Sequence, residues 1–265
     1  MGISFLNAQE LFTESYTLMG SAFELTVVAH DKAEAQAHIA TAKNEIERIE
    51  LLISSWDSNS ETSSINQNAG IKPIKVSKEL WDLIDRSQQI SKITSGAFDL
   101  TFAAVDQIWK FDGSETVMPD ADLIKASVSK IGYNQVQMNK EQSTVFLPQK
   151  GMKIGFGAIG KGYAADRAKQ LLVARGVEGG IINASGDMNT WGTQPDGSPW
   201  TIGIINPMNK EKVFSWFSLE HNAVVTSRNY EKFIRIDGKR YSHIIDPRTG
   251  IPSNGIISCT IFASK

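Results

Sequence analysis

Apolar residues that recur every three or four positions predict two long helices in the first hundred residues. The first begins after a cap at Asp31 and runs to about Ser54, with charged residues between its apolar positions. The second begins after a cap at Ser77 and ends at residues 94–96, where Thr-Ser-Gly breaks the pattern. The positions that we expect to face the core are Ala35, Ile39, Ile46, Ile49 and Ile53 in the first helix and Leu80, Leu83, Ile84, Ile90 and Ile93 in the second.

Runs of β-branched and aromatic residues, bounded by Gly and Pro, predict strands in most of the remaining chain. These runs cover residues 23–29, 180–184, 200–205, 214–219, 223–226, 233–236 and 256–262. We also expect a hairpin from residues 136–138 and 144–147, a strand opening at Lys153-Ile154, a short helix over 123–131 and a loop from Ser54 to Pro73. Two or three real helices packed among many strands indicate an α+β protein with antiparallel or mixed sheets.

Composition and charge narrow the class of protein. The chain has 265 residues, 41% of them hydrophobic, which is enough to bury a core as one large domain or two small ones. A formal net charge of −2 predicts no general affinity for nucleic acid or for an anionic membrane. No apolar run approaches the roughly 20 residues of a membrane-spanning helix. The single cysteine, Cys259, lies in an apolar run, so we expect a buried thiol and no disulfide.

The N-terminal residues allow two interpretations. Residues from Gly2 to Ala8 resemble the end of an export signal with a cleavage-like boundary after Ala8, but they lack the basic start and full length of a signal. An N-terminal arm fits equally well. We therefore assign residues 1–17 to an arm or to the remnant of an export signal, and residues 18–265 to a single domain.

The glycine-rich stretch from Met152 to Arg175 indicates an anion site. Its glycines precede a helix that we expect to run from Tyr163 to Gly176, and a lysine lies among them. Glycine lets backbone amides approach a ligand closely, and a helix N-terminus favours anions. The stretch therefore predicts a phosphate-binding turn built from Gly155, Gly157, Gly160, Lys161 and Gly162.

Two common phosphate-binding patterns match this turn incompletely. Gly155-x-Gly157-x-x-Gly160 fits the dinucleotide fingerprint, but the regular alternation of strands and helices that should surround it is missing. The same residues fit a P-loop up to Lys161, after which Gly162 replaces the Ser or Thr that would meet Mg²⁺. A glycine-rich turn that only packs a helix on a sheet remains the alternative.

Residues 241–250 form a second polar cluster. His243 is a candidate general base or electrostatic group, and Arg248 is a candidate partner for phosphate. A purely structural turn in which His243 lies near Asp246 is the alternative. Asp99, after an apolar turn, is either a site carboxylate or a cap for the next helix.

Seven motifs, in the family's order, resemble those of the ApbE-type FAD:protein FMN transferases, or flavin transferases. The similarity runs from about Leu18 to the C-terminus, and seven ordered motifs are far more specific than one. The motifs are Leu18-Met19-Gly20-Ser21, Ser55-Trp56-Asp57 with Ser64-Ile65-Asn66, Gly96-Ala97-Phe98-Asp99, Gly157 to Ala164 with Asp166, Asn183-Ala184-Ser185-Gly186-Asp187, Val225-Thr226-Ser227 and Ser242 to Gly250.

The resemblance implies a T-fold-like α+β protein of two intimate lobes. It implies an enzyme that binds FAD and Mg²⁺, splits the FAD pyrophosphate and attaches FMN through a phosphoester to a Thr of a partner protein. Such partners include subunits of sodium-translocating NADH:quinone oxidoreductase and related electron-transfer complexes; some members instead hydrolyse FAD to FMN and AMP. Members are usually exported, as periplasmic proteins or lipoproteins anchored in the inner membrane and facing the periplasm, with any anchor lying outside this segment.

The resemblance also assigns roles to individual residues. It places Met19 and Trp56 against the flavin ring, where a sulfur and an indole give apolar contact. His243 is the catalytic or orienting group, and the backbone carbonyl of Ala158 is a Mg²⁺ ligand. The remaining FAD contacts that it implies are Ala97, Phe98, Asp99, Lys161 and Ile244.

Four departures from the family pattern modify these expectations. Gly155 stands where the family has an acidic residue, and Ser185 replaces a Gly. Arg228 replaces a Gly after Thr226-Ser227, where we expect a strained φ or a blocked approach for the acceptor. The Ala-Asp-Ala-Leu-Ala-Thr-type motif whose Asp and Thr hold Mg²⁺ does not occur before Lys265, so we expect weak Mg²⁺ binding, impaired transfer and exposed core.

Three alternatives to the transferase remain open. The first is an FAD-binding protein without transferase activity, and the second is an FAD pyrophosphatase that gives FMN and AMP. The third is an enzyme that acts on a nucleotide phosphate and uses the P-loop-like turn.

Overall fold

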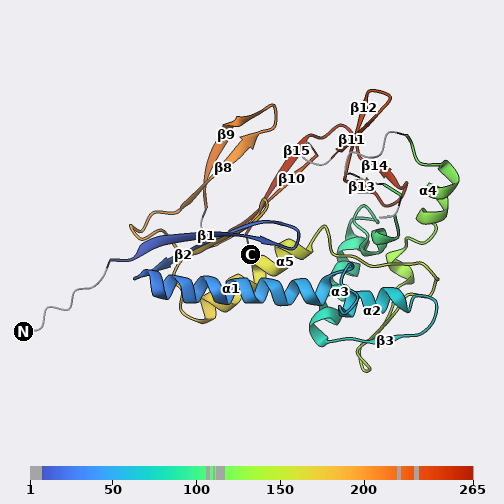
Figure 1. The fold of residues 1–265 in the computed structure, drawn as a ribbon, viewed down its shortest axis with the longest axis horizontal. Helices are drawn as coiled ribbons and strands as arrows, with labels where there is room; N and C mark the ends of the chain where they lie inside the picture. The colour runs from blue at the N-terminus through green and yellow to red at the C-terminus, as the bar shows by residue number, and fades with distance from the viewer. Residues whose placement is uncertain are drawn as a thin grey trace, which may run out of the picture. The chain divides into compact units, whose positions relative to one another are not determined.

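The chain forms two compact units, each discontinuous in sequence (Figure 1). This computed structural model describes residues 8–105, 108–109, 111, 117–219, 222–229 and 233–264. The first unit comprises residues 1–50, 158–227 and 258–265, and the second comprises residues 51–157 and 228–257. Of the segment predicted as an arm or signal remnant, residues 1–7 lie outside the described part, whereas residues from Glu10 onward form a strand of the first unit.

A six-stranded sheet organises the first unit. The strand pairs with a defined register are all antiparallel, which differs from the parallel sheet of a dinucleotide-binding fold. The strands of the sheet, in spatial order, are β1 (Glu10–Leu18), β2 (Ser21–Ala29), β6 (Gly180–Ala184), β7 (Asp187–Trp191), β10 (Asn222–Arg228) and β15 (Ser258–Ser264).

The helical layer of the first unit consists of two helices. Helix α1 (Lys32–Ile53) begins as predicted at Asp31, whose side chain accepts a hydrogen bond of 2.9 Å from the backbone N–H of Glu34. All five apolar positions predicted to face the core along this helix are buried. Helix α5 (Gly160–Ala174) packs against β6 and β7. Figure 1 shows α1 running alongside the strands β1 and β2.

The alternation of side chains along β2 supplies the core of the first unit on both sides of the sheet. Phe23, Leu25 and Val27 point to one face and are buried. Val28 points to the other face and packs against Trp200, Ile202 and Leu219 of a hairpin. That hairpin consists of β8 (Trp200–Asn206) and β9 (Asn209–Leu219).

The second unit combines short helices with small sheets. One three-stranded sheet has the order β3-β5-β4, and two further hairpins pair β11 with β12 and β13 with β14. The elements are α2 (Glu61–Gln67), β3 (Ile74–Lys75), α3 (Lys78–Ile93), the 3₁₀-helix η1 (Leu100–Val105), α4 (Ala121–Val128), the 3₁₀-helix η2 (Tyr133–Gln135), β4 (Gln137–Asn139), β5 (Thr144–Phe146), β11 (Phe233–Ile236), β12 (Lys239–Ser242), β13 (Ile245–Asp246) and β14 (Ile251–Pro252).

A hydrophobic cluster joins distant parts of the second unit. Val105, Trp109 and Ile124 pack with Ile234 and Ile236 of β11. The indole N–H of Trp109 donates a 2.8 Å hydrogen bond to the carbonyl of Gly250. Because a buried indole N–H needs an acceptor, this bond ties the loop after β13 to the core.

Three predictions about the second unit were wrong. The polar stretch from Ser54 to Pro73 contains helix α2, because the side chain of Ser60 caps it by accepting from the N–H of Ser63 at 2.9 Å. No strand begins at Lys153-Ile154, since that segment is held by a side chain, as described below. Ile93 is 82% exposed, because the buried face of α3 continues through Ser87 and Ser91.

The predicted burial of Cys259 was also wrong. Cys259 lies on β15, which is the outermost strand of the sheet beyond β10, and its side chain is exposed. Ile261 and Phe262 on the same strand are exposed as well. An apolar run in the sequence therefore marked an edge strand, and apolar content alone does not distinguish an edge strand from a central one.

Candidate functional site

The phosphate-binding turn predicted before the helix is the first turn of that helix. Helix α5 begins at Gly160 and not at Tyr163, so Lys161 is a helical residue. Ile159 stands at the N-cap position and supplies no side-chain hydrogen bond. The first N–H groups of α5 therefore lack a side-chain cap, and together with the ammonium of Lys161 they suit a phosphate group.

The turn between β6 and β7 lies beside Lys161. The Oδ2 atom of Asp187 is 3.9 Å from the Nζ atom of Lys161, and both side chains are largely buried. The backbone of Ser185 is left-handed, with φ +58°, and Gly186 follows at φ +104°. The side chain of Asn183 closes the turn by accepting from the Gly186 N–H at 3.0 Å. Ser185 is thus a strained departure from the family's Gly.

A buried polar network holds α5 against β7. Lys169 is only 7% exposed, and its ammonium donates to the side chain of Asn189 at 2.9 Å and to the carbonyl of Thr190 at 2.7 Å. The amide of Asn189 also donates to Asp166. Because each of these buried groups needs its partner, the network fixes the position of α5 along the sheet, and hence the position of Lys161.

Met19 occupies the tight turn between β1 and β2 in the same unit. Its φ is +51° and Gly20 follows at +65°, which is the conformation of a two-residue hairpin turn. The carboxylate of Glu50 accepts a 3.0 Å hydrogen bond from the Met19 N–H. A non-glycine residue held in this region of φ marks a functional candidate.

In the second unit, Trp56 projects from the turn after α1. Its side chain is 85% exposed, although a tryptophan is normally largely buried. The hydroxyl of Ser54 accepts hydrogen bonds from the N–H groups of Trp56 at 3.2 Å and of Asp57 at 3.0 Å, which fixes the turn. An exposed indole on a fixed turn suits a planar aromatic ligand.

Asp99 is buried and fully engaged by its own neighbourhood. It is 5% exposed, and its Oδ1 atom accepts from the N–H of Thr101 at 2.8 Å and from its hydroxyl at 2.6 Å. The Oδ2 atom accepts from the N–H of Tyr133 at 3.0 Å. Thr101 in turn accepts from the N–H of Gly132 at 2.8 Å. The carboxylate therefore anchors residues 132–133, in addition to standing next to Ala97 and Phe98.

The segment from Met152 to Phe156, predicted as a strand, takes its hydrogen bonds from a side chain. Asn66 donates to the carbonyl of Ile154 at 3.0 Å and accepts from the N–H of the same residue at 2.8 Å. The N–H of Gly155 donates to the carbonyl of Leu100 at 2.9 Å. A Cβ atom on Gly155 would lie 3.0 Å from that of Ala103, so the absence of the family's acidic side chain fits the local packing.

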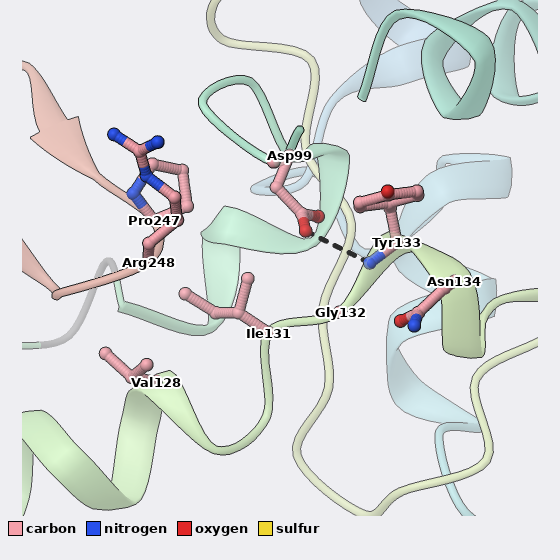
Figure 2. A pocket seen from close by; sticks show the side chains of 9 residues that line it. Asp99, Val128, Ile131, Gly132, Tyr133, Asn134, Pro247 and Arg248 are labelled. Carbon is pink, nitrogen blue, oxygen red and sulfur yellow. Dashed lines mark hydrogen bonds between the residues drawn. The ribbon is translucent and has the colours of Figure 1, made fainter. Parts of the chain in front are cut away.

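Beside Asp99 lies a cavity of about 270 Å³ within the second unit (Figure 2). Figure 2 shows Pro247 and Arg248 on one side of it, Asp99 and Tyr133 on the other, and Val128 and Ile131 beneath. Nine residues line it: Gly96, Asp99, Val128, Ile131, Gly132, Tyr133, Asn134, Pro247 and Arg248.

The loop from His243 to Arg248 presents several polar groups. His243 is exposed and meets the ring of Phe111 edge-on, with 6.4 Å between the ring centroids. Ile244 is 36% exposed, and its carbonyl accepts from the N–H of Ser253 at 2.6 Å. Arg248 forms two hydrogen bonds with Asp246, of 2.9 and 2.7 Å, and this partner holds the pKa of the Asp246 carboxyl below its usual value.

Two further expectations concern strain and metal binding. The predicted strain at Arg228 was wrong, because Arg228 lies in β10 and is not among the residues with positive φ.

No group of three His, Cys, Asp or Glu side chains that suits a metal ion occurs among the described residues. The carbonyl of Ala158 and the ion-paired Asp187 do not make the carboxylate-rich set that Mg²⁺ takes.

The predicted site residues fall into two groups, one in each unit. Met19, Ala158 and Lys161 belong to the first unit, and Trp56, Ala97, Phe98, Asp99, His243 and Ile244 belong to the second. Inspection of the sequence missed Tyr133 and Asn134, which line the cavity. They follow Gly132 in a short 3₁₀ turn without periodicity, so only the backbone bonds to Asp99 and Thr101 reveal them.

Comparisons with known proteins agree with the motif order. The family model described as "ApbE family" matches residues 19–265. A relative from Klebsiella pneumoniae (strain 342), named FAD:protein FMN transferase, is 32% identical over 261 residues, which cover 98% of this chain and 79% of the relative. One of the same name from Treponema pallidum (strain Nichols) is 30% identical over 88% of this chain and 68% of its own length.

Solved structures show the same fold. The ApbE protein of Thermotoga maritima is 29% identical and superposes with a TM-score of 0.89 over 96% of this chain and 82% of its own. The flavin transferase ApbE from Vibrio cholerae is 25% identical, with a TM-score of 0.85 over the same shares. These likenesses confirm the predicted α+β fold with antiparallel sheets. Among the described residues, no helix has the length and apolar character needed to cross a bilayer.

Proposed function

This chain belongs to the ApbE family, and from that premise we propose that it is a FAD:protein FMN transferase. The observation that carries the proposal is the match over residues 19–265, together with relatives of that name that align over nearly the whole chain. The substrates are FAD and an acceptor protein, and the products are the flavinylated acceptor and AMP.

The reaction is a displacement at the phosphorus atom of the FMN half of FAD. The acceptor hydroxyl oxygen forms a new bond to that phosphorus, the bridging bond to the AMP half breaks, and AMP leaves with the electron pair. The proton of the hydroxyl passes to a base. Such a reaction depends on groups that position the hydroxyl and stabilise the negative charge on the phosphoryl oxygens.

Individual residues of the chain suit separate parts of this chemistry. Lys161 and the uncapped N–H groups of α5 suit the pyrophosphate charge. His243, exposed on its loop, is the base that takes the hydroxyl proton. Trp56 and Met19 contact the flavin ring, and the backbone around Ala97 and Phe98 contacts another part of FAD.

We further propose that the acceptor hydroxyl belongs to a Thr of an exported electron-transfer protein and that the enzyme works in the periplasm. Both statements rest on the family resemblance.

A bound Mg²⁺ would neutralise negative charge on the phosphoryl oxygens, but the described residues do not form a set of ligands that suits it. We therefore assign no step of the reaction to the metal.

In-gel flavin fluorescence tests the proposal. The chain is incubated with FAD, Mg²⁺ and an acceptor domain that bears a target Thr, and the mixture is then denatured. Fluorescence on the acceptor band supports transfer, because only a covalent flavin survives denaturation. FMN and AMP released without a labelled acceptor identify an FAD pyrophosphatase, and bound FAD without any product identifies a binding protein.

A further inference from the structure

The hairpin of β11 and β12 has one buried face and one outward face. Ile234 and Ile236 of β11 are buried in the hydrophobic cluster of the second unit. Because side chains alternate along a strand, Phe233 and Arg235 point the other way. The register of the hairpin places Arg235 directly opposite Arg240 of β12. Both arginines therefore belong to the outward face.

The two guanidinium groups of the outward face lie against one aromatic ring. The Cζ atom of Arg240 is 4.0 Å from the centroid of the Phe233 ring, and that of Arg235 is 5.7 Å from it. Arg240 is held further, since it donates a 2.6 Å hydrogen bond to the carbonyl of Asn229. Contacts between a cation and a ring restrict the side chain before a partner arrives, so less conformational entropy is lost on binding.

The charges on this hairpin are not balanced. Like charges directly opposite each other destabilise a pair of strands, and Arg235 faces Arg240 in this way. Within the ranges that the structure describes, neither guanidinium forms an ion pair. Lys239 adds a third cation, and Asp237 is the only carboxylate between residues 233 and 242, although the whole chain has a net charge of −2. An anion bound to both arginines would relieve their repulsion.

Exposed apolar residues adjoin the two arginines. The backbone N–H of Asn229 donates to the carbonyl of Ile257 at 3.0 Å, and its carboxamide donates to the carbonyl of Ile256. Because Asn229 also accepts from Arg240, these bonds bring residues 256 and 257 next to the hairpin. Ile256 is 71% exposed and Ile257 is 40% exposed. We call this surface the arginine face, and it consists of Phe233, Arg235, Arg240, Ile256 and Ile257.

The composition and size of the arginine face favour a protein partner. Arginine and aromatic side chains beside apolar ones are typical of protein–protein interfaces. A nucleic-acid site commonly contacts about six to ten phosphates, and a site for anionic lipid gathers about four to eight cations. The hairpin offers only three cations, Arg235, Lys239 and Arg240. A guanidinium binds a carboxylate through two parallel hydrogen bonds, so two arginines match one or two carboxylates.

We propose that the arginine face binds an acidic segment of the acceptor protein. The inference rests on the proposed function, in which the acceptor brings a hydroxyl to His243. Arg240 precedes His243 by three residues in the chain, and three extended residues span about 10 Å. A short segment of the acceptor can therefore contact the arginine face while its hydroxyl lies at His243. The face retains and orients the acceptor and takes no part in breaking or forming bonds.

Initial rates of FMN transfer, measured against the concentration of an acceptor domain at saturating FAD, test this assignment. Arg235→Glu raises the KM for the acceptor about tenfold or more, because a hydrogen-bonded charge pair is replaced by repulsion. The kcat and the affinity for FAD stay within about twofold of wild type. Arg235→Gln, which removes the charge without reversing it, raises the KM by a smaller factor. Polyglutamate competes with the acceptor on the wild-type chain but not on Arg235→Glu.

Arg86→Glu is the matched control, because Arg86 is an exposed cation of α3 in the same unit and its reversal changes the net charge equally. It leaves the KM for the acceptor unchanged, and thermal unfolding confirms that every variant is folded. An unchanged KM in Arg235→Glu, or an equal rise in Arg86→Glu, overturns the assignment. A loss of FAD affinity in Arg235→Glu also overturns it, because the face would then bind the phosphates of FAD.

Direct binding separates this proposal from the transferase function. Surface plasmon resonance measures how tightly the chain binds an acceptor domain whose target Thr is replaced by Ala. Acceptor binding that Arg235→Glu weakens, in a chain that transfers no FMN, refutes only the transferase function. Transfer of FMN with equal acceptor binding by wild type and Arg235→Glu refutes only the role of the arginine face.

Discussion

The backbone N–H of Tyr133 donates a 3.0 Å hydrogen bond to the buried carboxylate of Asp99. Two residues 34 positions apart are joined in this way, and Thr101 extends the link to Gly132. The Gly-Ala-Phe-Asp motif is thus both a wall of the candidate site and the anchor for another wall. This double role underlies the first prediction.

Asp99→Asn lowers both stability and affinity for FAD. The amide that replaces Oδ2 faces the N–H of Tyr133 with a donor, so a buried N–H loses its acceptor at a cost of about 1–3 kcal/mol. Urea unfolding measures the free energy, and quenching of flavin fluorescence measures the affinity. Thr101→Val is the matched variant, because it removes the acceptor of Gly132 and the hydroxyl donor to Oδ1 of Asp99 but leaves the bond from the Tyr133 N–H to Oδ2 in place. Wild-type stability and affinity in both variants contradict the anchoring role.

His243→Ala lowers the rate of FMN transfer by about 10²–10⁴-fold and changes FAD affinity little. The reason is that a positioned general base contributes about this much to a rate, whereas His243 is exposed and contributes little to packing. Single-turnover kinetics with saturating FAD separates the two effects. His30→Ala, at another exposed histidine, serves as the control. A rate within tenfold of wild type removes His243 from the mechanism.

The ion pair between Asp246 and Arg248 contributes stability only above acidic pH. Arg248 lowers the pKa of the Asp246 carboxyl in the folded protein, so this stabilisation is complete above the unfolded pKa of about 3.9 and is lost as pH falls through the folded pKa. The difference in unfolding free energy between wild type and Asp246→Asn is therefore constant from pH 5 to 8 and shrinks below about pH 4. Urea unfolding across this range measures it. A difference that changes between pH 6 and 8 contradicts this account.

A chelator changes the affinity of this chain for FAD by less than about twofold. The described residues include no cluster of three metal-ligating side chains, and the carboxylates of Asp187 and Asp246 are engaged with Lys161 and Arg248, respectively. Quenching of flavin fluorescence, with Mg²⁺ or with chelator, measures the effect. If Mg²⁺ strongly raises the affinity for FAD, this prediction is wrong. Asp187→Asn then tests whether the Asp187 carboxylate leaves Lys161 to bind the metal.

Periodicity predicted the long elements of this fold well. The apolar spacing of α1 located both its cap at Asp31 and its buried face, because a long amphipathic helix repeats its pattern many times. The start of α5 was misplaced by three residues, since Gly160 and Gly162 are poor helix formers and concealed its first turn. Helix α2 was missed because a single capping residue, Ser60, specifies it.

The candidate site was predictable only in part, because half of it depends on contacts between distant residues. Motif order supplied His243, Lys161 and Asp99. No local pattern shows that Asn66 holds both backbone groups of Ile154, 88 residues away, or that Asp99 holds Tyr133. Likewise, the exposure of Cys259 follows from the position of β15 at the edge of the sheet, which is a property of topology.

The stoichiometry of covalent transfer tests the central claim most directly. The chain is incubated with FAD, Mg²⁺ and an acceptor protein, and intact-protein mass spectrometry and chromatography measure labelled acceptor and released AMP. The account predicts one AMP for each FMN attached, with the label lost when the target Thr is replaced by Ala. AMP released in equal amounts with and without the target Thr, and an acceptor that stays unlabelled, would contradict it.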